Sequence, residues 1–173
     1  MDNKIGQEVA QRILKKGGVG VLPTDTIYGL VGSALSKKAA VRIYKLRRRN
    51  LKKPMIVLIG SINDLKKFDV KLNAETRKII KKFWPGKVSV ILPCTSKKFS
   101  YLHRGTKTLA FRLPRKKSLL ALIRKTGPLV APSANIEGKP PAWTIKEAKK
   151  YFGDKADFYV DGGTIKKSPS MLI

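Results

Sequence analysis

The chain has 173 residues, of which 38 are lysine or arginine and 11 are aspartate or glutamate, so its formal net charge is +27. Its length suits one domain with a hydrophobic core, its apolar runs fall short of the roughly 20 residues that span a membrane, and its single cysteine excludes an internal disulfide. One histidine beside that cysteine also excludes a Cys/His metal cluster, and we expect a single domain over residues 1–173 in the cytoplasm, with neither membrane association nor a secretory leader.

Helix and strand patterns alternate over the first half of the chain. Apolar residues at helical spacing, or a capping residue before them, predict helices over residues 5–16, 36–46, 61–68 and 73–83. Short apolar runs predict strands over residues 19–23, 54–59 and 87–93. The second of these helices runs directly into a cationic stretch, YKLRRRNLKKP, over residues 44–54.

The second half follows the same alternation. A loop over residues 94–107 precedes a strand over 108–114, and an irregular segment occupies 133–143. The remaining helices and strands are predicted over residues 116–127, 128–132, 144–153 and 157–161. This interleaving predicts an α/β protein with a twisted, mixed sheet.

The excess of positive charge has two explanations. It is typical of proteins that bind an anionic partner such as RNA, DNA or a nucleotide, and it is also found where a surface is simply rich in lysine. Six of the nine residues from Lys45 to Lys53 are cationic. Charge alone therefore does not distinguish a nucleic-acid surface from a site for one phosphorylated ligand.

Small polar residues follow several of the predicted strands. They occur in PTDTIYGL after the first strand, in APSANIEGKPPA after a later one, and in DGG and KSPS after the last. Because ligands of open α/β sheets bind in loops beyond the strand ends, we expect these stretches to share one crevice. Each stretch taken alone is better explained as a turn.

Arg112 is a charged residue inside an otherwise apolar strand. With the alternation of a strand, Leu109, Phe111 and Leu113 share one face of the sheet, whereas Ala110 and Arg112 share the other. The guanidinium therefore either faces solvent or lines a pocket, where its planar fork would bind a carboxylate or a phosphate.

Several common catalytic patterns are missing. The sequence contains neither the P-loop pattern GxxxxGK[ST] nor GxGxxG, which disfavours a P-loop or dinucleotide-binding fold. His103 has no recognisable nucleophile partner, and Cys94, directly after a strand, is expected to be a small buried residue.

Six segments, taken in order, resemble one protein family. They are GGVGVLPTDTIYGLVGSA, the cationic stretch ending in KKPMIVLI, FWPGKVSVILP, LAFRLP, GPLVAPSANIEGKPP, and YVDGG followed by SPS. From Gly17 to Ser170 they are similar to the YrdC/TsaC family of L-threonylcarbamoyladenylate synthases, in its short, single-domain form. The resemblance implies a YrdC-like fold, a twisted and mostly mixed or antiparallel open sheet flanked by helices, with a positively charged concave pocket.

The resemblance also implies an activity. The family makes threonylcarbamoyl-AMP and diphosphate from ATP, L-threonine and bicarbonate, the first step of the threonylcarbamoyladenosine (t6A) modification of tRNA. The nucleophile would be the carboxylate of the substrate's own carbamate, so the protein would hold the substrates together and neutralise charge at the α-phosphate. Mg²⁺ would be carried by the ATP phosphates, with no metal ligand from the chain. The implied partners are the downstream t6A transferase proteins, with tRNA or double-stranded RNA as a further candidate.

Site residues follow from the resemblance by their place in these segments. The catalytic, phosphate-binding residues would be Arg47, Arg49 and Lys53. Arg47 and Arg49 stand at the K-x-R positions of the family, seven and five residues before Pro54, and Lys53 directly precedes that proline. ATP would be bound by Arg49, Lys53, Thr108, Ser133 and Asn135. L-threonine would be bound by Thr26, Arg112, Ala131 and Ser170. Their cationic neighbours Lys45, Arg48 and Lys52 are expected to face solvent.

The sequence departs from the family pattern at two places. Arg47 stands where the family has lysine, which keeps the charge but replaces a compact ammonium by a planar fork. The family continues after its last strand to a nucleotide-contacting arginine, whereas this chain ends at SMLI. The given chain is then truncated, naturally short, or one in which Lys166 or Lys167 takes that role.

Two other functions stay open. One is a non-catalytic protein of the same fold that binds double-stranded RNA or tRNA, suggested by the charge of +27 and the missing arginine. The other is a carbamoyl-transfer module like the related domain of hydrogenase maturation proteins. Those modules occur in larger chains with acylphosphatase and zinc-finger segments, which this sequence lacks.

Overall fold

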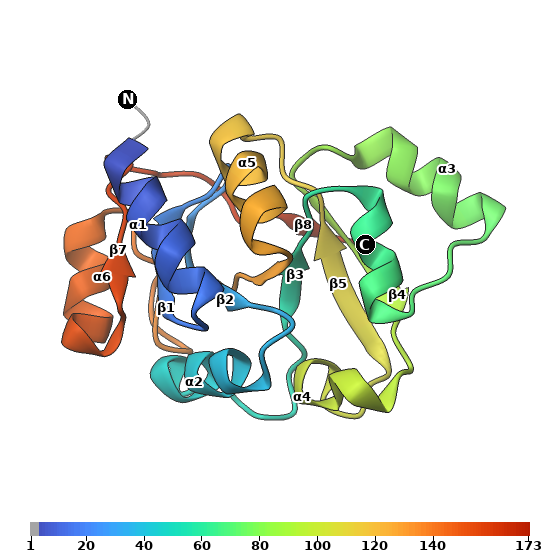
Figure 1. Cartoon of the computed structure of the whole chain (residues 1–173), viewed down its shortest axis with the longest axis horizontal. Helices are drawn as coiled ribbons and strands as arrows, with labels where there is room; N and C mark the ends of the chain where they lie inside the picture. Colours follow the sequence, from blue (N-terminus) through green and yellow to red (C-terminus); the bar gives the residue numbers. More distant parts are fainter. Residues whose placement is uncertain (1–3) are drawn as a thin grey trace.

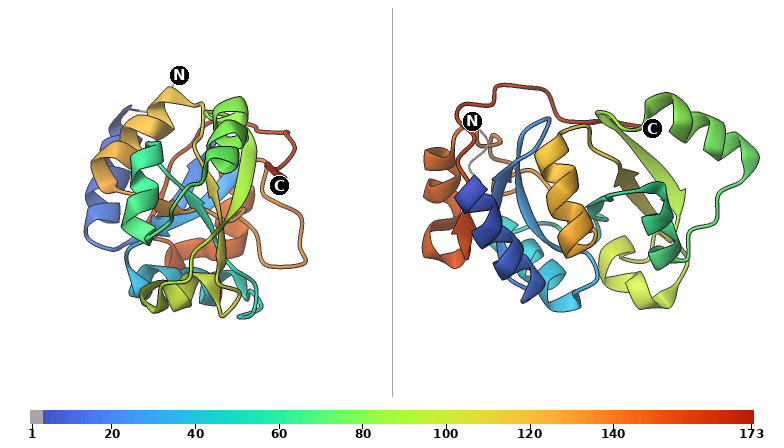
Figure 2. Two further views of the ribbon diagram at one scale, coloured as in Figure 1. Left: turned by 90° about the vertical axis from the view of Figure 1, so that its right-hand side faces the viewer. Right: turned by 45° about the horizontal axis from the view of Figure 1, so that its top comes forward.

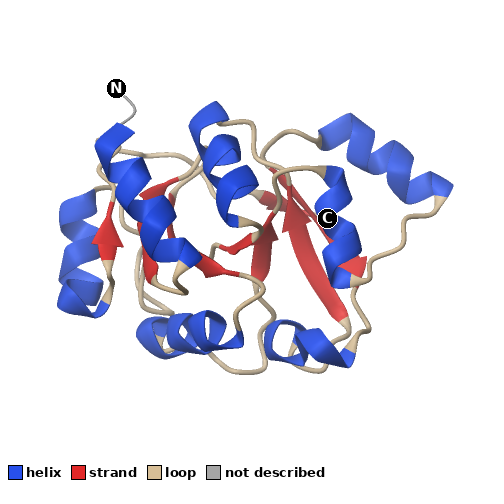
Figure 3. Cartoon of the chain, viewed as in Figure 1, coloured by secondary structure: helices blue, strands red, loops and turns tan. Residues whose placement is uncertain are grey.

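Eight strands within residues 4–173 form one mixed sheet that helices flank (Figures 1 and 3). The computed structural model describes residues 4–173. Residues 1–3, the start of the N-terminal stretch for which no secretory leader is expected, lie outside this range. The strands are β1 (Val19–Pro23), β2 (Tyr28–Ser33), β3 (Ile56–Leu58), β4 (Val88–Pro93), β5 (Thr108–Arg112), β6 (Leu129–Val130), β7 (Phe158–Tyr159) and β8 (Met171–Leu172). The α-helices are α1 (Lys4–Lys15), α2 (Lys37–Arg47), α3 (Ala74–Phe83), α4 (Ser100–His103), α5 (Lys117–Thr126) and α6 (Ile145–Phe152).

The order of the strands brings distant segments together. Across the sheet the order is β7-β1-β2-β6-β3-β5-β4-β8. The pairs β1–β2, β2–β6, β3–β6 and β4–β5 are antiparallel, and the pairs β1–β7, β3–β5 and β4–β8 are parallel. The α/β class and the mixed sheet are thus confirmed. Because β6 lies between β2 and β3, the chain that leaves it reaches the start of β2, where Gly29 pairs with Ser133.

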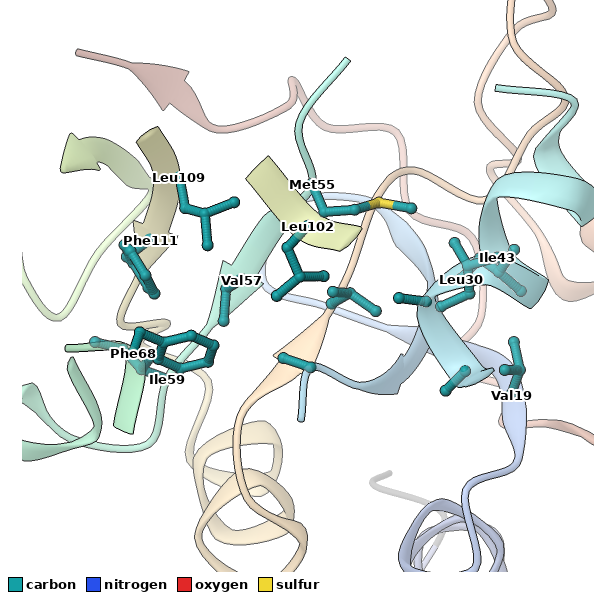
Figure 4. Close-up of a cluster of buried hydrophobic side chains, with 14 of the residues drawn as sticks. Val19, Leu30, Ile43, Met55, Val57, Ile59, Phe68, Leu102, Leu109 and Phe111 are labelled. Carbon is teal, nitrogen blue, oxygen red and sulfur yellow. The ribbon is translucent and has the colours of Figure 1, made fainter. Parts of the chain in front are cut away.

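One face of the sheet carries the larger apolar cluster. Val19, Leu30, Val57 and Phe111 point to this face from four strands, and α2 and α4 pack against them (Figure 4). Phe68 extends the cluster, with its ring centroid 5.2 Å from that of Phe111. Burial of these side chains removes apolar surface from water, which is the main force that stabilises the fold.

Helices cover only part of the opposite face. Leu22, Val31 and Leu58, at the alternate positions of their strands, pack against α1 and α5, which contact each other (Figure 1). Farther along the sheet the same face carries Ala110 and Arg112, which line a cavity instead of packing under a helix. The division of Leu109 and Phe111 from Ala110 and Arg112 is as the strand alternation predicted.

The sequence did not predict β2. Gly29 and Gly32 interrupt its apolar run, although every residue of the strand before Ser33 is buried. A Cβ at position 32 would lie 3.2 Å from the Cβ of Ala39, so the glycine allows α2 to pack closely on the strand. Gly32, which the packing of α2 requires, is thus also a residue that interrupts the apolar pattern of the strand.

One other prediction needs correction: the predicted loop over 94–107 contains the 3-10 turn Lys97–Phe99 followed by α4. The helix predicted over 61–68 is present as the 3-10 helix Ile62–Phe68. In α1 the buried residues are Ala10 and Leu14, which face α5 and the sheet, whereas Ile5 is 76% exposed. None of the helices within residues 4–173 combines the length and the apolar content of a membrane-spanning helix.

Candidate active site

The part of the sheet face that α1 and α5 leave open forms a cavity of about 490 Å³. Residues of β3, β4 and β5 line it, together with the end of α2, the segment 131–133, and Thr24, Thr26 and Ile27 of the loop before β2. The C-terminal segment crosses from the β7 side to the β4 edge (Figure 2) and adds Pro169, Ser170 and Leu172 to the lining. The predicted site residues that line the cavity are Thr26, Arg47, Arg49, Lys53, Thr108, Arg112, Ala131, Ser133 and Ser170. None of the described lining residues is an aspartate or a glutamate.

Arg47 is the last residue of α2 and is only 4% exposed. Its Nε donates to the carbonyl of Asn135 at 3.0 Å, and its Nη2 donates to Ser133 Oγ and Asn135 Oδ1, each at 3.1 Å. Its Nη1 is buried without a hydrogen-bond partner among the described residues. Burial, followed by the charge of Arg49, lowers the pKa of Arg47 to about 10, so the group stays protonated at neutral pH. A buried cation with a spare donor favours an anionic ligand.

The end of α2 directs Arg47 and Arg49 to the cavity and Arg48 away from it. Arg48 adopts a left-handed conformation with φ at 49°, which ends the helix, and it is exposed. Arg49 donates from Nη2 to the carbonyl of Pro54 at 2.8 Å, while its Nε is buried without a partner among the described residues. A second spare guanidinium donor therefore lies beside the first.

Lys53 also lines the cavity, but its charge is paired with that of Glu137. The two side chains form an ion pair, and the other carboxylate oxygen of Glu137 accepts the N–H of Asn50 at 2.5 Å. The hydrogen bond from Lys53 is the main cause of a pKa of Glu137 below its usual value. The sequence offered no signal for this pair, because its members lie 84 residues apart in different loops.

Arg112 is held by Asp25 of the PTDT loop. Arg112 Nη1 lies 2.5 Å from Asp25 Oδ1, and the two side chains are 4% and 10% exposed. Asp25 Oδ2 accepts the N–H of Arg115 at 3.0 Å, so both carboxylate oxygens are used. The Nε of Arg112 is buried without a partner among the described residues. Asp25 thus fixes one edge of the guanidinium and leaves Nε for a ligand carboxylate.

Hydroxyl groups complete the lining. Thr24 Oγ1 accepts the N–H groups of Thr26 and Ile27 and donates to the carbonyl of Ile27 at 2.6 Å, which fixes a tight turn. This turn holds the hydroxyl of Thr26 at 3.0 Å from that of Thr24. Across the cavity the hydroxyls of Ser89 and Ser170 lie 2.9 Å apart. Ser89 was not predicted, although a serine at an inward position of a valine-rich strand was a usable signal.

Two predicted nucleotide contacts differ in their placement. Thr108 lines the cavity at the start of β5, and its hydroxyl is 3.3 Å from that of Thr106. Asn135 is not among the lining residues, because its Oδ1 accepts from Arg47 and its Nδ2 donates to the carbonyls of Ile136 and Lys139. In this arrangement Asn135 positions Arg47, and its direct contact with ATP stays a prediction.

The environments of His103 and Cys94 are those of structural residues. Gly105 N–H donates to Nδ1 of His103 at 3.1 Å, so Nε2 carries the proton that faces the Ser96 carbonyl at 3.3 Å. Burial raises the pKa of the Cys94 thiol to about 11. Within residues 4–173, no three or more His, Cys, Asp and Glu side chains are grouped so that they could hold a metal ion.

Comparison with known proteins places these features in one family. Residues 12–173 match the model of the Sua5/YciO/YrdC family, which is described as "Telomere recombination". The chain is 35% identical over 164 residues to a threonylcarbamoyl-AMP synthase of Bacillus subtilis, a match that covers 94% of this chain and 47% of that protein. It is 34% identical over 162 residues to a threonylcarbamoyl-AMP synthase of Nitrosococcus oceani, covering 92% and 87%.

A solved structure has the same fold. The crystal structure of Pyrococcus abyssi Sua5 in complex with L-threonine superposes with a TM-score of 0.89 at 31% identity, and the match covers 96% of this chain and 50% of that one. The chain thus spans about half the length of the Bacillus subtilis and Pyrococcus abyssi proteins.

Proposed function

The chain belongs to the Sua5/YciO/YrdC family, and from this premise we propose that it synthesises threonylcarbamoyl-AMP. The substrates would be ATP, L-threonine and bicarbonate, and the second product would be diphosphate. Relatives that carry the name threonylcarbamoyl-AMP synthase, and a relative solved with L-threonine, support this activity.

The observation that carries the proposal is the distribution of cations in the cavity. Arg47, Arg49 and Lys53 come from the end of α2 and the segment after it, whereas Arg112 comes from β5. Three of the guanidinium nitrogens there are buried without partners among residues 4–173. One group of cations suits the phosphates of ATP, and the single arginine suits the carboxylate of an amino acid.

The proposed chemistry asks the protein for charge and position, not for a nucleophile. The amine of L-threonine and bicarbonate form a carbamate with loss of water. A carbamate oxygen then attacks the α-phosphorus of ATP, and the bond to the leaving diphosphate breaks. Arg49, Arg47 and Lys53 would neutralise the charge that grows on the phosphate oxygens, while Arg112, Thr26 and Ser170 would hold the threonine end in line.

Mg²⁺ would enter this site with the nucleotide. The cavity offers hydroxyls and cations but no lining carboxylate among the described residues, a donor set that does not suit a resident Mg²⁺. We therefore propose that the ATP phosphates hold the ion. In the cell, the product would pass to t6A transferase proteins in the cytoplasm, with tRNA as the final acceptor.

The direct test is diphosphate release. With ATP, Mg²⁺, bicarbonate and L-threonine, the purified protein is expected to release diphosphate, and omission of L-threonine is expected to suppress the release. Binding of ATP and L-threonine should also raise the melting temperature, because a ligand that binds only the folded state stabilises it. No release and no shift in melting, together with salt-sensitive RNA binding, would favour the non-catalytic RNA-binding function instead.

Replacement of Glu137 by Gln is expected to lower the KM for ATP about three-fold or more, because Glu137 neutralises the cations that would bind the phosphates. The glutamine keeps an oxygen for the N–H of Asn50, so the loop would stay in place while Lys53 loses its ion pair. The KM for ATP is measured from diphosphate release at saturating L-threonine.

Glu75→Gln is the matched control for this experiment. Its replacement changes the net charge by the same amount as Glu137→Gln. Glu75 is exposed in the first turn of α3 and does not line the cavity. We expect no change in KM from the control. A higher KM for ATP in Glu137→Gln would mean that the ion pair organises the site instead of competing with phosphate.

A further inference from the structure

A second cavity, of about 860 Å³, lies on the other side of the ion pair between Asp25 and Arg112. Thr24 lines both cavities, whereas Arg112 lines only the first and Asp25 only the second. The other residues of the second cavity come from the end of α3, the approach to β4, the connection from β5 to α5, and the C-terminal segment. They are Lys82, Phe83, Gly86, Lys87, Arg115, Lys116, Gly162, Thr164, Ile165 and Lys167.

The lining of this cavity is richer in lysine and arginine than the chain as a whole. Five of its twelve lining residues are lysine or arginine, compared with 38 of the 173 residues of the chain. The five come from three separate parts of the chain, so the enrichment is not the result of one basic run. The fold therefore gathers positive charge here beyond what composition alone provides.

The one carboxylate among the described lining residues, that of Asp25, is paired with Arg112, which does not line this cavity. Both oxygens of Asp25 are occupied, one by Arg112 at 2.5 Å and the other by the backbone N–H of Arg115 at 3.0 Å. The side chains of Lys82, Lys87, Arg115 and Lys167 form no ion pair with any carboxylate of residues 4–173. Like charges held around one hollow repel each other, and an anion between them would relieve that repulsion.

We propose that the second cavity binds a phosphate-rich anion. A carboxylate ligand would bring one charge, whereas a short chain of phosphates brings several charges and oxygens that reach cations on different walls. A free oligophosphate and the backbone of a nucleic acid share this chemistry. The proposal does not depend on the function of the first cavity, because no cation lines both.

The test is calorimetric titration with tripolyphosphate. It is done in the Arg49→Ala background, so that the first cavity lacks one of its main phosphate contacts. Residual binding is expected to fall about ten-fold when Lys82→Gln and Lys87→Gln are added, and to fall further with salt. The matched control adds Lys146→Gln and Lys150→Gln instead, which remove the same amount of charge. Both lysines are exposed on α6 and do not line the cavity.

Three results decide the proposal and the source of the anion. An equal loss in the α6 control, or no residual binding in the Arg49→Ala background, would overturn it. Loss confined to the Lys82 and Lys87 pair would support it. In that case, competition by a short RNA duplex would identify a nucleic-acid backbone as the occupant, and lack of competition would identify a free oligophosphate.

Discussion

Arg49→Ala is expected to lower kcat/KM for diphosphate release by about a hundred-fold or more, the loss typical when one preorganised donor to a developing charge is removed. Arg49 lines the cavity with an Nε that has no partner among the described residues, and its Nη2 donates to the carbonyl of Pro54. Loss of that bond would change the free energy of unfolding by only about 1 kcal/mol. The two quantities are measured by initial rates and by urea unfolding of the same preparation.

Lys45→Ala provides the matched control. Lys45 is exposed in the last turn of α2, two residues before the helix ends at Arg47, and its replacement also removes one positive charge. Its kcat/KM is expected to stay within about two-fold of the unchanged protein, because exposed charges interact weakly through water. Full activity in Arg49→Ala would show that the phosphates of ATP bind elsewhere.

Asp25→Ala is expected to destabilise the protein by about 3 kcal/mol, because it leaves the charge of Arg112 buried without its partner. Arg112→Leu should also destabilise, since it leaves the Asp25 carboxylate with only the N–H of Arg115. The double variant is expected to lose less free energy of unfolding than the sum of the two single losses, with a difference of about 1 kcal/mol or more. Urea unfolding of the three variants gives this coupling energy.

Activity in the same variants separates stability from function. The double variant should regain stability without regaining threonine-dependent diphosphate release, because it has no guanidinium at the threonine end. Lys67→Ala, which breaks the more exposed pair with Asp64, should cost no more than about 0.5 kcal/mol. Additive losses for Asp25 and Arg112 would mean that the pair contributes nothing as a pair.

The sequence predicted the fold where local patterns and packing agree. The strands at 19–23 and 108–114 are apolar at the positions that the core needs, and β1 and β5 lie within these ranges. The strand β2 escaped prediction because Gly32 serves the approach of α2, a requirement that only the packed structure reveals. Likewise, the burial of Ala10 and Leu14 depends on how α1 packs against α5.

For the site, the residue types were predictable and their partners were not. The alternation around Arg112 correctly separated it from Phe111, and Arg47 and Arg49 of the cationic stretch line the cavity. That Arg48 turns outward follows from its left-handed backbone, which no pattern in three consecutive arginines reveals. Asp25 and Glu137 were missed because each acts on a partner more than 80 residues away.

The alternation of β5 ties the site to the fold in a further way. Phe111 and Arg112 are neighbours on one strand, yet one is packed in the core and the other lines the cavity. If β5 slipped by one residue against β3 and β4, the guanidinium would enter the core and the ring would enter the cavity. Such a slip would bury an unpaired charge, so the misaligned sheet would be much less stable than the native one. The residue proposed to recognise the substrate thus also enforces the correct alignment of the sheet during folding.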